Sequence, residues 1–144
     1  MTHRNAGRYA AKHGQGAGPD ERIAGAVRRK VREGEFACAA AEKVGAELGV
    51  TMAEVGRTLD LLEIRIKRCQ LGLFGYDREQ KGLKPADRLD GALEKAILGR
   101  LSEGRLSCIA AWEIAAENGI PRRKLSSACE ALKIRINHCQ LGAF

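Results

Sequence analysis

The sequence lacks any apolar run long enough to cross a membrane. A membrane-spanning helix needs about 20 consecutive apolar residues, and no stretch of the 144-residue chain approaches that length. The first residues also lack the apolar core of a secretion signal. These absences predict a cytoplasmic protein with no membrane partner, in a reducing compartment where cysteines stay as thiols or bind metal.

Motifs of catalysis are missing as well. The chain has no phosphate-binding loop, no paired carboxylates, no Ser–His–Asp set and no His-Glu-x-x-His. Its five cysteines never occur as Cys-x-x-Cys, the spacing that indicates a metal site most strongly. We therefore expect a protein that is not an enzyme and has no obligatory cofactor.

A string near the middle of the chain returns at its end. Residues 64–74 read IRIKRCQLGLF, and residues 134–144 read IRINHCQLGAF. At this offset of 70 residues, 18 of the 53 pairs formed by 22–74 and 92–144 are identical. The pattern is typical of one structural unit used twice. A unit of about 55 residues buries a marginal core alone, so we expect the two to pack on each other, as a pseudo-dimer, or on a second chain.

Composition divides the chain into four segments. Residues 1–20 are rich in Gly, Ala and basic side chains, which predicts a disordered basic tail. Residues 77–90 are charged and contain Gly and Pro, as linkers do, and they separate repeats at 21–76 and 91–144. The net charge of +7 permits a polyanionic partner without requiring one.

Each repeat is expected to form three helices and one strand. Apolar residues at helical spacing, turn glycines and an alternating segment define them. In the first repeat the helices are predicted near 21–32, 39–48 and 52–62, and the strand at 64–68. In the second they are predicted near 91–101, 109–118 and from Pro121 onward, with the strand at 134–140. Gly49 is expected to end a helix, and Thr51 with Glu54 to cap the next.

A helix, a turn with glycine and a second helix form the helix-turn-helix pattern. Residues 46–55, AELGVTMAEV, resemble this motif of bacterial regulators. The apolar link before the second helix and the strand after the third resemble the winged-helix variant, in which both pair into a small sheet. The resemblance implies a mainly α fold of two tandem winged-helix-like repeats that bind DNA. The usual wing hairpin is absent after Gly72 and Gly142, so the wing is reduced or completed by the other unit.

The third helix of the second repeat is expected to be the main reader of duplex DNA. It begins with three cations and two hydroxyls, which suit phosphates and base edges. The corresponding helix of the first repeat carries Glu54 and Asp60, which oppose a phosphate-lined groove. The candidate DNA contacts are Arg122, Arg123, Lys124, Ser126 and Ser127, then Thr51, Met52 and Arg57, and on the strands Arg65, Lys67, Arg68 and Arg135.

Four cysteines recur at equivalent positions of the two repeats. They are Cys38, Cys69, Cys108 and Cys139. Buried packing, a zinc or iron–sulfur site and a disulfide are all compatible with them. Cys129 stands where the first repeat has Leu59 and is expected in the core. Besides DNA binding, the sequence therefore leaves two other functions open: a protein-interaction adaptor built on the same helices, and a cysteine-ligated metal or redox sensor.

Overall fold

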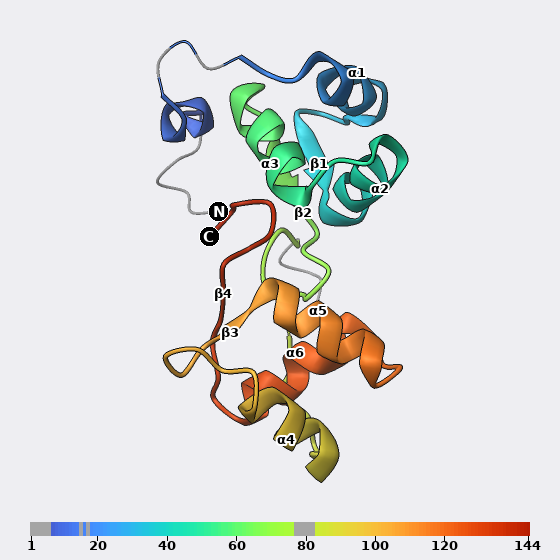
Figure 1. The fold of residues 1–144 in the computed structure, drawn as a ribbon, viewed down its shortest axis with the longest axis vertical. Coiled ribbons are helices and arrows are strands. Elements are labelled where there is room, and N and C mark those ends of the chain that lie inside the picture. The colour runs from blue at the N-terminus through green and yellow to red at the C-terminus, as the bar shows by residue number, and fades with distance from the viewer. Residues whose placement is uncertain (1–6, 15, 17, 77–82) are drawn as a thin grey trace. The chain divides into compact units, whose positions relative to one another are not determined.

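The computed structural model describes residues 7–14, 16, 18–76 and 83–144. The described chain is mainly helical (Figure 1) and forms two compact units. Unit 1 consists of Met1–Cys69 together with Gln140–Phe144, and unit 2 of Gln70–Cys139. None of the helices in the described part of the chain is long and apolar enough to span a membrane.

Unit 1 contains four helical segments and two short strands. In chain order they are η2 (Tyr9–Lys12, a 3-10 helix), α1 (Glu21–Lys30), β1 (Glu35–Ala37), α2 (Cys38–Leu48), α3 (Met52–Leu61) and β2 (Arg65–Lys67). The carboxylate of Asp20 caps α1 by accepting from the backbone of Arg22 and Ile23. The apolar face that predicted this helix is buried, since Ile23 is 1% exposed.

The turn between α2 and α3 follows from local chemistry. Gly49 ends α2 with a φ of 65°, a conformation that glycine adopts without strain. Thr51 and Glu54 then form the predicted capping box, in which each side chain accepts from the backbone N–H of the other residue. Val50 donates its N–H to the carbonyl of Gly45, which closes the turn at 3.0 Å. These predictions are confirmed.

The apolar link and the strand pair as expected. β1 and β2 are parallel, with Phe36 opposite Ile66, and both of these side chains are 1% exposed. Parallel strands need a long crossover connection, which α2 and α3 supply here. The strand pair thus brings the chain before α2 and the chain after α3 together in one core.

Unit 2 has the same order of elements. They are α4 (Gly91–Leu98), β3 (Leu106–Ser107), α5 (Cys108–Glu117), α6 (Arg122–Ala131) and β4 (Ile136–Asn137), and β3 pairs with β4 in parallel. Gly119 turns the chain before α6 with a φ of 62°. The strand is shorter than the predicted 134–140, and α4 ends before the predicted residue 101, at the C-cap Gly99.

Part of the predicted disordered tail is folded. Tyr9 begins η2 and is only 4% exposed, because this segment packs on α3. The prediction for 1–20 was therefore wrong over residues 9–12. Residues 1–6 and the first part of the predicted linker, 77–82, lie outside the described residues.

The end of each repeated string packs against a helix of the other repeat. Leu141 lies against Gly56 of α3 in unit 1, while Gln70 contacts Arg122 of α6 in unit 2. Leu71 and Leu141 are 0% and 2% exposed, so each string contributes a buried side chain. The predicted ranges 21–76 and 91–144 thus differ from the compact units by this exchange.

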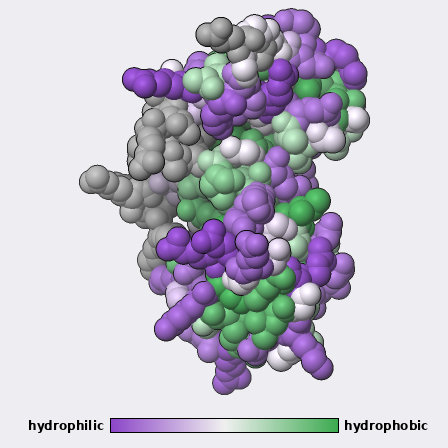
Figure 2. Space-filling view, turned by 60° about the vertical axis from the view of Figure 1, so that its left-hand side comes forward, coloured by the Kyte–Doolittle hydropathy of each residue, from purple (hydrophilic) through white to green (hydrophobic). Residues whose placement is uncertain are grey.

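Few large apolar side chains are exposed in the described chain. They are Leu98 (51%), Ile109 (52%) and Phe144 (41%). Figure 2 shows a face on which hydrophilic residues predominate and hydrophobic patches lie between them.

Candidate nucleic-acid interface

The N-terminal turn of α6 presents a group of cations. Pro121 caps the helix, and Arg122, Arg123 and Lys124 follow it directly, with no acidic residue in the first turn. Arg123 and Lys124 are exposed to solvent. The partial positive charge of a helix N-terminus adds to these cations and favours an anionic partner.

Arg122 is half-buried and is held on two sides. Its guanidinium carbon lies 3.6 Å from the centre of the Trp112 ring of α5, a cation–π contact. One of its nitrogens, Nη1, donates to Oε1 of Gln70 at 2.8 Å. Gln70 was not among the predicted site residues, because it lies 52 positions away in the sequence.

Arg123 is in contact with the same stretch of chain that supplies Gln70. Its guanidinium carbon lies 5.0 Å from the centre of the Tyr76 ring. Gly72 is buried beside it, and a Cβ on Gly72 would lie 3.2 Å from the guanidinium carbon. Of the three cations, Lys124 is therefore the one whose side chain stands apart from these contacts.

The two serines of α6 are less accessible to solvent than Arg123 and Lys124. Ser126 is 0% exposed, so the prediction that it contacts DNA was wrong. Its hydroxyl is on the buried face that also carries Leu125 and Cys129, and within the described residues it has no hydrogen-bond partner. Ser127 is half-buried, and its carbonyl accepts from the N–H of Ala86 at 2.9 Å.

A second pair of exposed cations lies at the start of the small sheet in unit 2. The N–H of Leu106 donates to the carbonyl of Arg135 at 3.0 Å, which places Arg105 beside Arg135. Both side chains are exposed. Arg135 was predicted; Arg105 was missed, although the 70-residue offset places it where unit 1 has Glu35. This replacement of an acidic residue by a basic one is the sequence signal that could have identified Arg105 as a candidate contact.

The corresponding place in unit 1 has mixed charge. Glu35 lies opposite Arg65 in the β1–β2 register, and it forms an ion pair with Lys67 at 3.3 Å. Arg65 and Arg68 are exposed, and Arg68 turns the chain with a φ of 48°. The strand cations of unit 1 are thus partly compensated, unlike those of unit 2.

The candidate contacts on α3 are also occupied or partly buried. The hydroxyl of Thr51 caps the helix, and Met52 is half-buried. Arg57 is exposed and donates to the carbonyl of Gly18 at 3.5 Å. The start of α3 carries Glu54 in its first turn, where α6 carries only bases.

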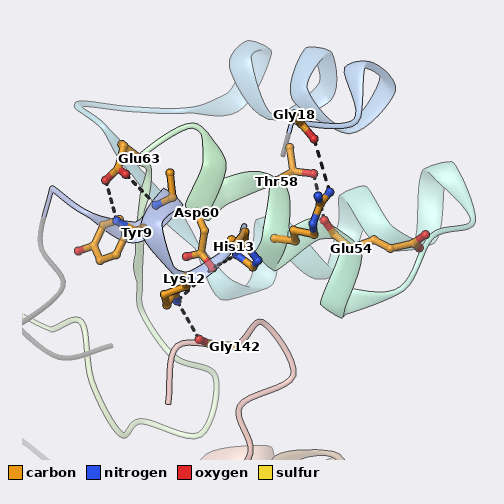
Figure 3. A network of polar contacts seen from close by, with 11 residues as sticks. Tyr9, Lys12, His13, Gly18, Glu54, Thr58, Asp60, Glu63 and Gly142 are labelled. Atoms are coloured by element: carbon orange, nitrogen blue, oxygen red, sulfur yellow. Dashed lines mark hydrogen bonds and ion pairs between the residues drawn. The ribbon is translucent and has the colours of Figure 1, made fainter. Parts of the chain in front are cut away.

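A short segment at the beginning of the chain covers the later half of α3 (Figure 3). The backbone N–H groups of Tyr9 and Ala10 donate to the carboxylate of Glu63 at 2.9 and 2.8 Å. Asp60, which is 4% exposed, accepts from Nζ of Lys12 at 3.0 Å and contacts Nε2 of His13 at 2.9 Å. We call residues 8–13 the strap. It binds Asp60 near the end of α3 and Glu63 just beyond the helix.

The predicted metal ligands are thiols, two in each unit. Cys38, Cys69 and Cys108 are buried, Cys139 is half-buried, and none of them forms a disulfide. Within the described ranges no three His, Cys, Asp or Glu side chains are placed to hold a metal ion. Zinc or iron–sulfur binding stays a prediction. Burial and the nearby Glu130 raise the pKa of the fifth cysteine, Cys129, to about 11.

Known proteins offer no guide to this interface. Comparison of the chain with protein families, with characterised proteins and with solved structures finds no significant match.

Proposed function

We propose that this protein binds double-stranded DNA, with unit 2 as the main reader. The observation that carries this proposal is the start of α6, where Arg123 and Lys124 are exposed in a first turn that has no acidic residue. In a helix-turn-helix, the beginning of the second helix is the part that meets the base edges and phosphates. Arg and Lys are the side chains that suit guanine edges and phosphates there.

The same proposal interprets the fold as two winged-helix-like repeats. In unit 2, α5, the turn at Gly119 and α6 would form the helix-turn-helix, and the β3–β4 pair would stand in for the wing. The exposed side chains of Arg105 and Arg135 on that pair would contact phosphates, since their cations are suited to positioning rather than to sequence reading.

Unit 1 has a supporting role in this proposal. The strap covers Asp60 at the end of α3 and Glu63 just after it, and Glu35 compensates Lys67 on the sheet. A carboxylate facing phosphates is unfavourable, so Glu54 further disfavours α3 as a reader. We infer that unit 2 reads the DNA, whereas unit 1 has a structural role.

A salt titration with random duplex DNA tests the proposal. The association constant should fall steeply as salt concentration rises, because each phosphate contact releases a counterion. Lys124→Ala and Arg105→Ala should each weaken binding and lower the slope by about one. Arg57→Ala on α3 should cause a much smaller loss. Absence of binding at low salt, or equal losses at Lys124 and Arg57, would contradict the proposal.

A protein-interaction role is the second candidate. It rests on Leu98 and Ile109, which are about half exposed although both are large apolar residues of unit 2. Exposed apolar side chains of this kind are common where proteins associate. Changing both to Ser would leave the DNA titration unchanged if they serve a protein partner alone, which separates the two functions.

A further inference from the structure

The stretch that follows β2 holds the arginines of α6. We call residues 70–76 the cover segment. Gln70 accepts a hydrogen bond from Arg122 at 2.8 Å, and the ring of Tyr76 lies 5.0 Å from the guanidinium of Arg123. Between them, Leu71 is 0% exposed and Gly72 is buried against Arg123. The segment is therefore packed onto the turn of α6 that the proposed function assigns to DNA.

This arrangement depends on the side chains of α6 and not on the string alone. The string that ends the second repeat packs on α3 near Gly56, where the residues at the positions of Arg122 and Arg123 are Met52 and Ala53. Neither of these has a guanidinium to hold. The carbonyl of Gly142 in that string instead accepts from Lys12 at 3.1 Å.

The contacts of the cover segment compete with those that DNA would make. A guanidinium that reads guanine or binds phosphate uses its planar N–H donors. Arg122 already donates one hydrogen bond to Gln70, and the face of its guanidinium is stacked on Trp112 at 3.6 Å. A helix that enters the major groove also needs its first turn clear of other chain segments.

We propose that the cover segment is an intramolecular gate on the DNA-binding turn of α6: when duplex DNA binds, Arg122 is released from Gln70 and the exposed Arg123 leaves the ring of Tyr76. This inference rests on the proposed function and adds its regulation. The closed form is the one described here, in which Lys124 alone of the three cations stands apart from the segment. Release exchanges the contacts with Gln70 and Tyr76 for contacts with DNA.

The affinity of the full-length chain for a random duplex at low salt tests the gate. Gln70→Ala should tighten binding about three- to tenfold, because one hydrogen bond to a charged group no longer opposes release. Gln70→Glu is nearly isosteric and should weaken binding, because a carboxylate holds Arg122 more strongly. Gln140→Ala, the matched change in the other string, should leave the affinity unchanged.

Trp112 provides a second readout, since it is the only tryptophan in the chain. Its emission should change when duplex DNA is added to the unmodified protein, and should already be changed in Gln70→Ala without DNA. This signal follows the Arg122–Trp112 contact itself and so does not depend on affinity. Circular dichroism of each variant shows whether the helices are intact.

The outcomes separate the gate from the proposed function. If the unmodified chain binds DNA and Lys124→Ala weakens it, but Gln70→Ala binds equally or more weakly, the gate is wrong and the DNA proposal stands. If neither the unmodified chain nor Gln70→Ala binds at low salt, both are wrong. If Gln70→Ala fails to fold, Gln70→Glu decides: unchanged or tighter binding overturns the gate.

Discussion

Gly56 is the position in α3 where an added Cβ atom would prevent the observed packing against Leu141. It is buried in the helix, and an ideal Cβ built there would overlap the carbonyl oxygen of Leu141 and lie 2.6 Å from its carbonyl carbon. Backbone atoms yield less readily than the end of a flexible side chain. Glycine is required here for close approach, although it is a poor helix former.

Alanine at this position should destabilise the protein. We expect Gly56→Ala to lower the free energy of unfolding by about 2–3 kcal/mol, since the backbone of Leu141 must move. Gly25→Ala in α1 is the matched control, because its Cβ would have an ordinary contact at 3.8 Å. The control should gain about 0.5–1 kcal/mol from higher helix propensity. Urea denaturation measures both, and a loss of similar size in the two variants would contradict the packing.

The buried thiol of Cys129 should make stability depend on alkaline pH. Its pKa is about 11 in the folded protein against an ordinary 9.0, so below pH 9 the thiol is protonated in both folded and unfolded chains. Between pH 9 and about 11 the unfolded chain releases this proton and the folded chain does not, and stability falls. Denaturation midpoints across this range should show a steeper fall in the unmodified protein than in Cys129→Ala. Identical slopes would rule out this contribution.

At the scale of elements, α3 differs from α6 in what covers it. The strap contacts Asp60 and Glu63 of unit 1. The equivalent positions in unit 2 are Glu130 and Lys133, both exposed. Glu130 is therefore open to solvent where Asp60 is covered by the strap, whereas Ser127 of α6 accepts a hydrogen bond from the N–H of Ala86.

Removing the carboxylate of Asp60 should loosen the strap. Asp60→Ala loses the contacts with Lys12 and His13, and we expect it to lower stability by about 1–3 kcal/mol. Glu130→Ala, at the exposed equivalent position, should stay within about 0.5 kcal/mol of the unmodified protein. Hydrogen exchange of the Tyr9 and Ala10 amides reports the strap directly, and unchanged protection in Asp60→Ala would show that it is held by other contacts.

At the scale of the whole molecule, the ends of the two strings are exchanged between the compact units. Residues 140–144 belong to unit 1, and residues 70–76 belong to unit 2. Leu141 thereby adds a buried side chain to the core of unit 1, and Leu71 adds one to the core of unit 2. The exchange makes each unit depend on the other repeat for completion.

Deletion of residues 140–144 should therefore weaken unit 1 rather than unit 2. We expect faster amide exchange in α3, which loses its contact with Leu141, while α6 keeps its protection through residues 70–76. Hydrogen exchange followed by mass spectrometry resolves the two helices within one sample. Loss of protection in α6 with α3 unchanged would mean that each string stabilises the helices of its own repeat.

Local signals predicted the elements well. The Gly49 turn and the Thr51–Glu54 capping box depend on residues within a few positions of one another, and both are present. The strap was missed because Tyr9 meets Glu63 across 54 positions of sequence. A short basic segment with little apolar content gives no local sign of its docking site.

The sequence by itself determined the helices and the turns between them, because helical periodicity, capping and turn chemistry are local. The pairing of each apolar link with its strand was implied only by the resemblance to winged-helix proteins. Only the tertiary structure decided which cations are accessible. It buried Ser126, placed Gln70 and Tyr76 against Arg122 and Arg123, and left Lys124 and Arg105 exposed. Those outcomes depend on where segments that are distant in the sequence pack, which no local pattern reveals.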